Sequence, residues 1–167
     1  MTVIFIHGAD GFDDDAPLAA SLEQHLGVPV TYPRMPDTDD WGPAIAAALS
    51  EATSPLVLVA HSAGGYQLLK HLAAAPPLDI ASIHIIAAPF PGGDPDWTFD
   101  GFDLPTHLDR IPRPIYLYAS EDDEVVPFAH RDLWAVELPG AQVRTTSGGH
   151  QLHNDLTLVS VRVASAP

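Results

Sequence analysis

Short apolar runs rich in β-branched residues alternate along this chain with segments of helical period. Strands that are apolar throughout, separated by amphipathic helices, are typical of a parallel sheet covered by helices on both faces. The pattern therefore predicts an α/β protein with a three-layer α/β/α sandwich. We expect six strands, at Thr2–Ile6, Val28–Tyr32, Leu56–Ala60, Ala81–Ala87, Pro114–Ala119 and Ala141–Thr145.

Apolar stripes of helical spacing lie between the expected strands. The first stripe ends at Gly27 and is preceded by Asp13–Asp15, acids that favour a helix N-terminus. Further helices are expected at Trp41–Leu49, from Tyr66 to a stop at Pro76-Pro77, at Phe128–Glu137, and at the closing stripe Leu152–Val163. We interpret these stripes as core.

Length and charge narrow the class of protein. A chain of 167 residues is the size of one domain, so a single domain over residues 1–167 is expected. A formal net charge of −15 argues against nucleic acid and anionic membrane surfaces as partners. Absence of cysteine excludes a disulfide framework. Thr2–Ile6 is too short for a signal sequence and no apolar run reaches membrane-spanning length, so we expect a cytoplasmic protein.

The residues Ala60-His61-Ser62-Ala63-Gly64-Gly65 join an expected strand to an expected helix. A serine between small residues at such a turn is held in a strained conformation with its hydroxyl exposed, as a nucleophile requires. Ala60 stands where the first of two glycines is usual. The motif alone is equally compatible with Ser62 as an ordinary helix cap.

Two further segments supply an acid and a base. Ser120-Glu121-Asp122-Asp123-Glu124-Val125-Val126-Pro127 follows the fifth strand, and Ser147-Gly148-Gly149-His150 follows the sixth. A hydrolytic serine needs a histidine base and a carboxylate that orients it. Glu121 and Glu124 are interpreted as solvated loop residues. The order nucleophile, acid, histidine is that of one fold family.

Residues 88–112 interrupt the alternation with many prolines, glycines and aromatic residues. A compact domain rarely carries so long an irregular connection without a function. Trp97 and Phe99 are expected to line a substrate pocket; the alternative is that they pack onto the sheet.

Together these motifs resemble the α/β-hydrolase superfamily, and the chain length resembles the small retinoblastoma-binding-protein-type serine hydrolases. The resemblance spans nearly the whole chain and includes His7-Gly8 after the first strand. It implies the strand order 2-1-3-4-5-6 and a minimal α/β-hydrolase fold with little or no cap.

The resemblance also implies roles for individual residues. Ser62 would be the nucleophile, His150 rather than His153 the base, and Asp123 the orienting acid, with Asp122 as the fallback. The oxyanion donors would be the backbone amides of Ala9 and Ala63. The residues expected to border the substrate are Gly8, Asp10, His61, Trp97 and Phe99, although Asp10 is also a candidate turn cap and His61 a candidate supporting residue.

The expected function is therefore that of a serine hydrolase, without metal or cofactor, that cleaves a small-molecule ester, thioester or activated amide through an acyl-enzyme at Ser62. The alternative is a non-catalytic protein-interaction module on the same scaffold, since a protein partner is implied by the resemblance only. A Rossmann nucleotide binder is disfavoured because His7-Gly8-Ala9-Asp10-Gly11 lacks the glycine spacing that holds a pyrophosphate.

Overall fold

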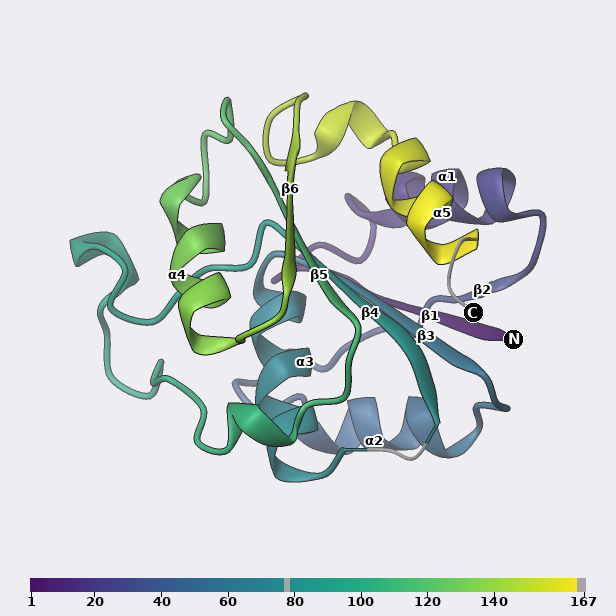
Figure 1. Ribbon diagram of the computed structural model, residues 1–167, viewed down its shortest axis with the longest axis horizontal. Helices are drawn as coiled ribbons and strands as arrows, with labels where there is room; N and C mark the ends of the chain where they lie inside the picture. Colours follow the sequence, from purple (N-terminus) through teal and green to yellow (C-terminus); the bar gives the residue numbers. More distant parts are fainter. Residues whose placement is uncertain (77–78, 165–167) are drawn as a thin grey trace.

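Six parallel strands form one sheet in the order β2-β1-β3-β4-β5-β6 (Figure 1). The computed structural model describes residues 1–76 and 79–164. The predicted strands and their order are confirmed, but β2 is shorter than expected. The strands are β1 (Thr2–Ile6), β2 (Val30–Thr31), β3 (Leu56–His61), β4 (Ile80–Ile86), β5 (Ile115–Ser120) and β6 (Gln142–Thr146).

Helices cover both faces of the sheet, as the three-layer prediction requires (Figure 1). The buried side chains of α1 (Ala16–Leu26) and α5 (Thr157–Ala164) pack on one face. Those of α2 (Gly42–Ser50), α3 (Ala63–Ala74) and α4 (Ala129–Glu137) pack on the other. No helix in the described ranges is long and apolar enough to cross a membrane.

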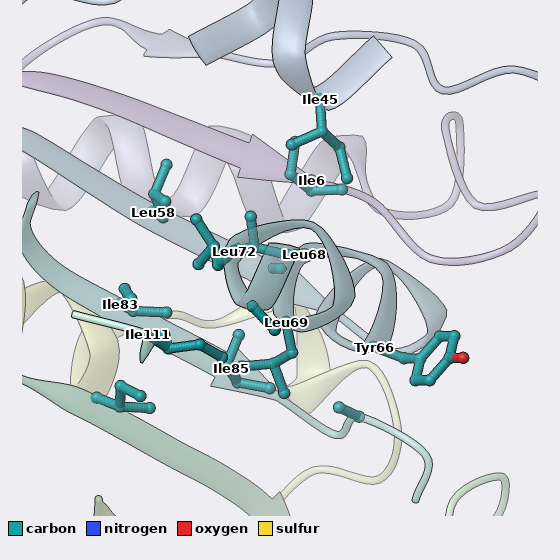
Figure 2. Packing of buried hydrophobic residues seen from close by; sticks show 14 of the residues in the cluster. Ile6, Ile45, Leu58, Tyr66, Leu68, Leu69, Leu72, Ile83, Ile85 and Ile111 are labelled. Carbon is teal, nitrogen blue, oxygen red and sulfur yellow. The ribbon is translucent and has the colours of Figure 1, made fainter. Parts of the chain in front are cut away.

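Alternation along the strands divides the core into two clusters. Val3 and Phe5 of β1 face α1, whereas Ile4 and Ile6 face α2 and α3. Figure 2 shows the second cluster, in which leucines of α3 meet aliphatic side chains of the sheet. Its labelled members are Ile6, Ile45, Leu58, Tyr66, Leu68, Leu69, Leu72, Ile83, Ile85 and Ile111. This packing holds α3, and with it the turn at Ser62, against the sheet.

The strand order creates a switch point at β1 and β3. Ile6 is the register partner of Ala60, so the two strands end at the same edge. The chain moves to β2 on one side of β1 and returns to β3 on the other. Loops at the carboxyl ends of such strands diverge and leave a crevice between them.

Two helix boundaries differ from prediction. The closing helix was expected from Leu152, but Leu152–Asn154 form a 3-10 turn with φ of 48° to 58°, and α5 begins at Thr157. Residues with a left-handed backbone cannot form the start of a right-handed α-helix. The apolar residues of this segment nevertheless have the spacing of a helix, so the sequence pattern alone does not reveal the turn. Helix α3 begins at Ala63 and ends at Ala74, before Pro76; Pro77 lies outside the described residues.

Candidate active site

Ser62 lies in the tight turn between β3 and α3. Its backbone has φ 52° and ψ −129°, a left-handed conformation that is costly for a residue with a side chain. The Ser62 amide donates to the carbonyl oxygen of Ile86 at 2.8 Å, which ties the turn to β4. Its side chain makes no hydrogen bond to the first turn of α3, so the helix-cap interpretation receives no support.

Small residues around Ser62 are a steric requirement. A Cβ added at Gly64 would lie 2.2 Å from the carbonyl oxygen of His7, and one at Gly65 would lie 2.8 Å from Cβ of Ala88. These contacts show how closely α3 approaches the loops after β1 and β4. Ala60, in contrast, fits in the sheet with its side chain fully buried.

Asp123 and His150 form a hydrogen-bonded pair. The Nδ1 atom of His150 lies 2.9 Å from Oδ2 and 3.1 Å from Oδ1 of Asp123. Oδ1 also accepts the amide hydrogens of Val125 and Val126, both at 2.8 Å. Burial raises the pKa of Asp123, but the hydrogen bonds from His150 and the two amides outweigh it and lower the pKa. An ionised Asp123 requires a proton on Nδ1, which leaves Nε2 as an acceptor.

The neighbouring acids hold the loop that carries His150. Oε2 of Glu124, which the sequence analysis interprets as a solvated loop residue, accepts the backbone amide of His150 at 3.1 Å. A Cβ at Gly149 would lie 2.7 Å from the same oxygen, and Gly149 has φ +67°. Asp122 accepts the amide of Gly148 at 3.3 Å, so it contacts the glycine turn.

Ser62 and His150 line one cavity of about 680 Å³. The hydrogen bonds among the described residues do not include one between the Ser62 hydroxyl and His150. Such contacts are often formed only when substrate is bound. The cavity thus brings the two side chains to the same space.

Gly8 and Ala9 form the cavity wall beside Ser62. A Cβ at Gly8 would lie 3.1 Å from Cβ of Ser62, so the loop after β1 reaches the turn closely. Ala63 is the first residue of α3, where the N–H groups have no acceptor within the helix. No hydrogen bond in the described ranges uses the Ala9 amide. Asp10 has φ 52° and lines a neighbouring cavity of about 480 Å³ instead.

Aromatic side chains from residues 88–112 complete the cavity. Trp97 and Phe99 line it, and the exposed Phe99 ring stacks on Phe102 with centroids 4.8 Å apart. The segment is fastened by His130, whose Nε2 donates to Asp94 at 2.9 Å and whose Nδ1 accepts the amide of Phe90.

Asp15 and His61 form a second aspartate–histidine pair, joined at 2.9 Å and about 1% exposed on both sides. Asp15 was expected only as an acid at a helix start, but it makes no side-chain cap on α1. Its other contacts are with Gly8 and Gln151. His61 lines the cavity, yet both of its ring nitrogens bond to protein groups.

The histidines and acids of the described residues are not gathered into a cluster of metal-ligand type. No group of three histidine, aspartate or glutamate side chains is arranged to hold a metal ion there. His153, the alternative histidine, has φ 48° and lies in the 3-10 turn after His150.

The sheet order, the strained serine after β3 and the helices on both faces define an α/β hydrolase. A family model described as serine hydrolase matches residues 12–155. The chain belongs to this serine hydrolase family. No protein in the curated comparison matches it significantly.

Solved structures support the fold. The chain is similar to the ydeN gene product of Bacillus subtilis, with a TM-score of 0.79, 21% identity and coverage of 99% of this chain and 97% of that one. It is also similar to a ydeN-like hydrolase from Pectobacterium atrosepticum, with a TM-score of 0.73, 21% identity and coverage of 99% of this chain and 89% of that one. A pyrethroid hydrolase from Sphingobium faniae is similar with a TM-score of 0.69, 17% identity and coverage of 98% of this chain and 96% of that one.

Proposed function

We propose that this chain is a carboxyl-ester hydrolase that acts through an acyl-enzyme on Ser62. The observation that carries the proposal is the strained serine in one cavity with a histidine whose Nδ1 is held by Asp123. Residues 1–167 would form a single domain of this kind. The resemblance to the small retinoblastoma-binding-protein-type hydrolases is part of the proposal.

The mechanism follows from the proton positions. With Nδ1 protonated toward Asp123, His150 Nε2 takes the proton as the Ser62 oxygen bonds to the carbonyl carbon. The resulting oxyanion would be bound by the amides of Ala9 and Ala63. Collapse breaks the ester bond, and the leaving alkoxide receives the proton from His150. Water then repeats these steps on the acyl-enzyme, which releases the acid and free Ser62.

The cavity wall favours an ester with a bulky apolar or aromatic group. Its aromatic lining residues are Trp41, Tyr66, Trp97, Phe99 and Phe102. A volume of about 680 Å³ is in the range of small-molecule sites. The pyrethroid hydrolase and an esterase, Est1E from Butyrivibrio proteoclasticus, solved with ferulic acid, are consistent with this class. Thioesters and activated amides would react by the same steps.

Labelling with a fluorophosphonate probe tests the proposal. We expect the parent protein to label, Ser62→Ala to lose labelling, and His150→Ala to label far more slowly, with turnover of p-nitrophenyl and naphthyl esters changing in parallel. If the folded parent does not label, or Ser62→Ala labels equally, the enzyme proposal is wrong. A non-catalytic interaction module would then be the better interpretation.

A further inference from the structure

His61 stands out among the buried histidines because of what surrounds its ring. Nδ1 lies 2.9 Å from Oδ2 of Asp15, and Nε2 lies 2.9 Å from the backbone carbonyl oxygen of His150. Neither an ionised carboxylate nor a carbonyl can donate a hydrogen bond. A neutral imidazole has one N–H, so it would leave one nitrogen lone pair facing an oxygen lone pair in a site that is 1% exposed.

The other buried histidines of the described chain have no such conflict. His7 donates from Nδ1 to the carbonyl of Gly8 and accepts the amide of Met35 on Nε2. His130 accepts on Nδ1 and donates from Nε2. His84 lies between two hydroxyl groups, each of which donates or accepts. His150 bonds through Nδ1 alone. A second ring proton is required at His61 only.

The groups around Asp15 decide where the extra proton resides. Oδ2 accepts the amide of Gly8 at 2.7 Å in addition to His61, and Oδ1 accepts the amide group of Gln151 at 3.0 Å. Burial raises the pKa of Asp15, but the hydrogen bonds from His61, Gly8 and Gln151 outweigh it and lower the pKa. Three donors directed at one carboxyl group favour the anion. The proton therefore belongs to the imidazole.

We propose that Asp15 and His61 form a buried carboxylate–imidazolium pair that positions both the Ala9 amide and His150 around Ser62. The carboxylate holds the amide of Gly8, the residue before Ala9. The imidazolium holds the backbone carbonyl of His150 itself. The Gly8 amide and the His150 carbonyl belong to the loops that carry the proposed oxyanion donor and the proposed base. Asp15 and His61 are therefore positioning residues, and this inference rests on the reaction proposed above.

The pair joins segments that are far apart in the sequence. Asp15 precedes α1, His61 ends β3, Gly8 follows β1, and His150 and Gln151 follow β6. Titratable groups near the pair include the His150 ring, whose centroid lies 4.6 Å from that of His61, and the Tyr32 hydroxyl, whose pKa is raised by burial and by the Asp15 charge.

Asp15→Asn tests the charge with little change of shape. Its carbonyl can still accept from Gly8 and His61, and rotation of the Gln151 amide satisfies the new NH₂ group. Without the anion, His61 loses its second proton.

Two further variants complete the set. His61→Gln removes the ring. His84→Gln is the matched control, because His84 is a buried histidine that does not line the cavity. Circular dichroism confirms that each variant is folded.

The first readout is nitrogen-15 NMR of histidine-labelled protein at pH 7.5. We expect one imidazole with protons on both ring nitrogens, absent in His61→Gln, reduced to one proton in Asp15→Asn, and unchanged in His84→Gln. A neutral His61 in the parent protein would overturn the ion pair. This readout does not depend on activity, so it stands even if labelling of Ser62 fails.

The second readout is kinetic. We expect Asp15→Asn to lower kcat for p-nitrophenyl esters about 10- to 100-fold, with KM changed less than about twofold, because misplaced groups affect the transition state more than substrate binding. His84→Gln should keep kcat. Unchanged kcat in a folded Asp15→Asn protein, or a rise in KM as large as the fall in kcat, would overturn the positioning role.

Discussion

Asp123 holds His150 with a carboxylate that is itself held by the chain: Oδ1 accepts two backbone amides while Oδ2 lies 2.9 Å from Nδ1. The carboxylate cannot rotate without losing these bonds. The imidazole orientation is therefore set by the turn at Val125 and Val126 as much as by Asp123.

Asp123→Asn should lower kcat about 10⁴-fold, because an amide no longer selects the Nδ1-protonated tautomer of His150. Steady-state hydrolysis of a p-nitrophenyl ester measures this. The control is Glu121→Gln, at an exposed residue of the same loop, which should retain activity. A loss of less than tenfold in Asp123→Asn would contradict the assigned role.

Gly64→Ala should lower the free energy of unfolding by more than about 3 kcal/mol, because the new Cβ meets backbone carbonyl oxygens of His7 and Ile6 that cannot move aside. Urea denaturation followed by tryptophan fluorescence measures it. Ala60→Gly, which restores the usual glycine, should cost only about 0.5–1 kcal/mol. Equal effects of the two changes would show that the close approach at Gly64 is not required.

Phe99→Ala should raise KM for a naphthyl ester about 3- to 10-fold, since a lost aromatic contact is worth about 0.5–1.5 kcal/mol. KM for an acetyl ester of a small alcohol should change little. Val136→Ala, on the exposed face of α4, is the control and should affect neither substrate. Parallel changes for both esters would mean that Phe99 does not form part of the specificity wall.

His84 should contribute to acid sensitivity. Burial lowers its pKa to about 3 in the folded state, from an ordinary value of 6.5. Its contribution to stability is therefore complete above pH 6.5 and is lost as the pH falls from 6.5 toward 3. The loss should be about 1.4 kcal/mol per pH unit, because unfolding takes up one proton there.

Urea unfolding of the parent and His84→Gln proteins between pH 7 and 4.5 checks this. The difference in free energy of unfolding between the two proteins should shrink by about 1.4 kcal/mol for each pH unit below 6.5. His107→Asn, at an exposed histidine, should leave the slope unchanged. A constant difference between parent and His84→Gln would contradict the neutral buried state.

Much of the scaffold could be predicted because it depends on local patterns. The apolar runs of β1, β3 and β5 have only one plausible interpretation between helices. The ends of β3, β5 and β6 place Ser62, Asp123 and His150 on loops at one edge. The start of α5 could not be predicted, because the left-handed turn at Leu152 has the same apolar spacing as a helix.

Asp15 was missed for a different reason. In the sequence it is one of three consecutive aspartates, and nothing distinguishes it from Asp13 and Asp14. Its burial depends on donors from Gly8, His61 and Gln151, which only the folded chain brings together. Long-range polar contacts of this kind leave no periodic signal.

The segment between β4 and β5 carries Trp97, Phe99 and Phe102, whereas Ser62, Asp123 and His150 all lie outside it. In the proposed enzyme, a large part of the substrate wall is thus encoded in a stretch of the gene separate from the residues that cleave the bond. If the proposed function holds, exchanging residues 88–112 for the corresponding stretch of another family member should change which esters are accepted while Ser62, Asp123 and His150 stay in place.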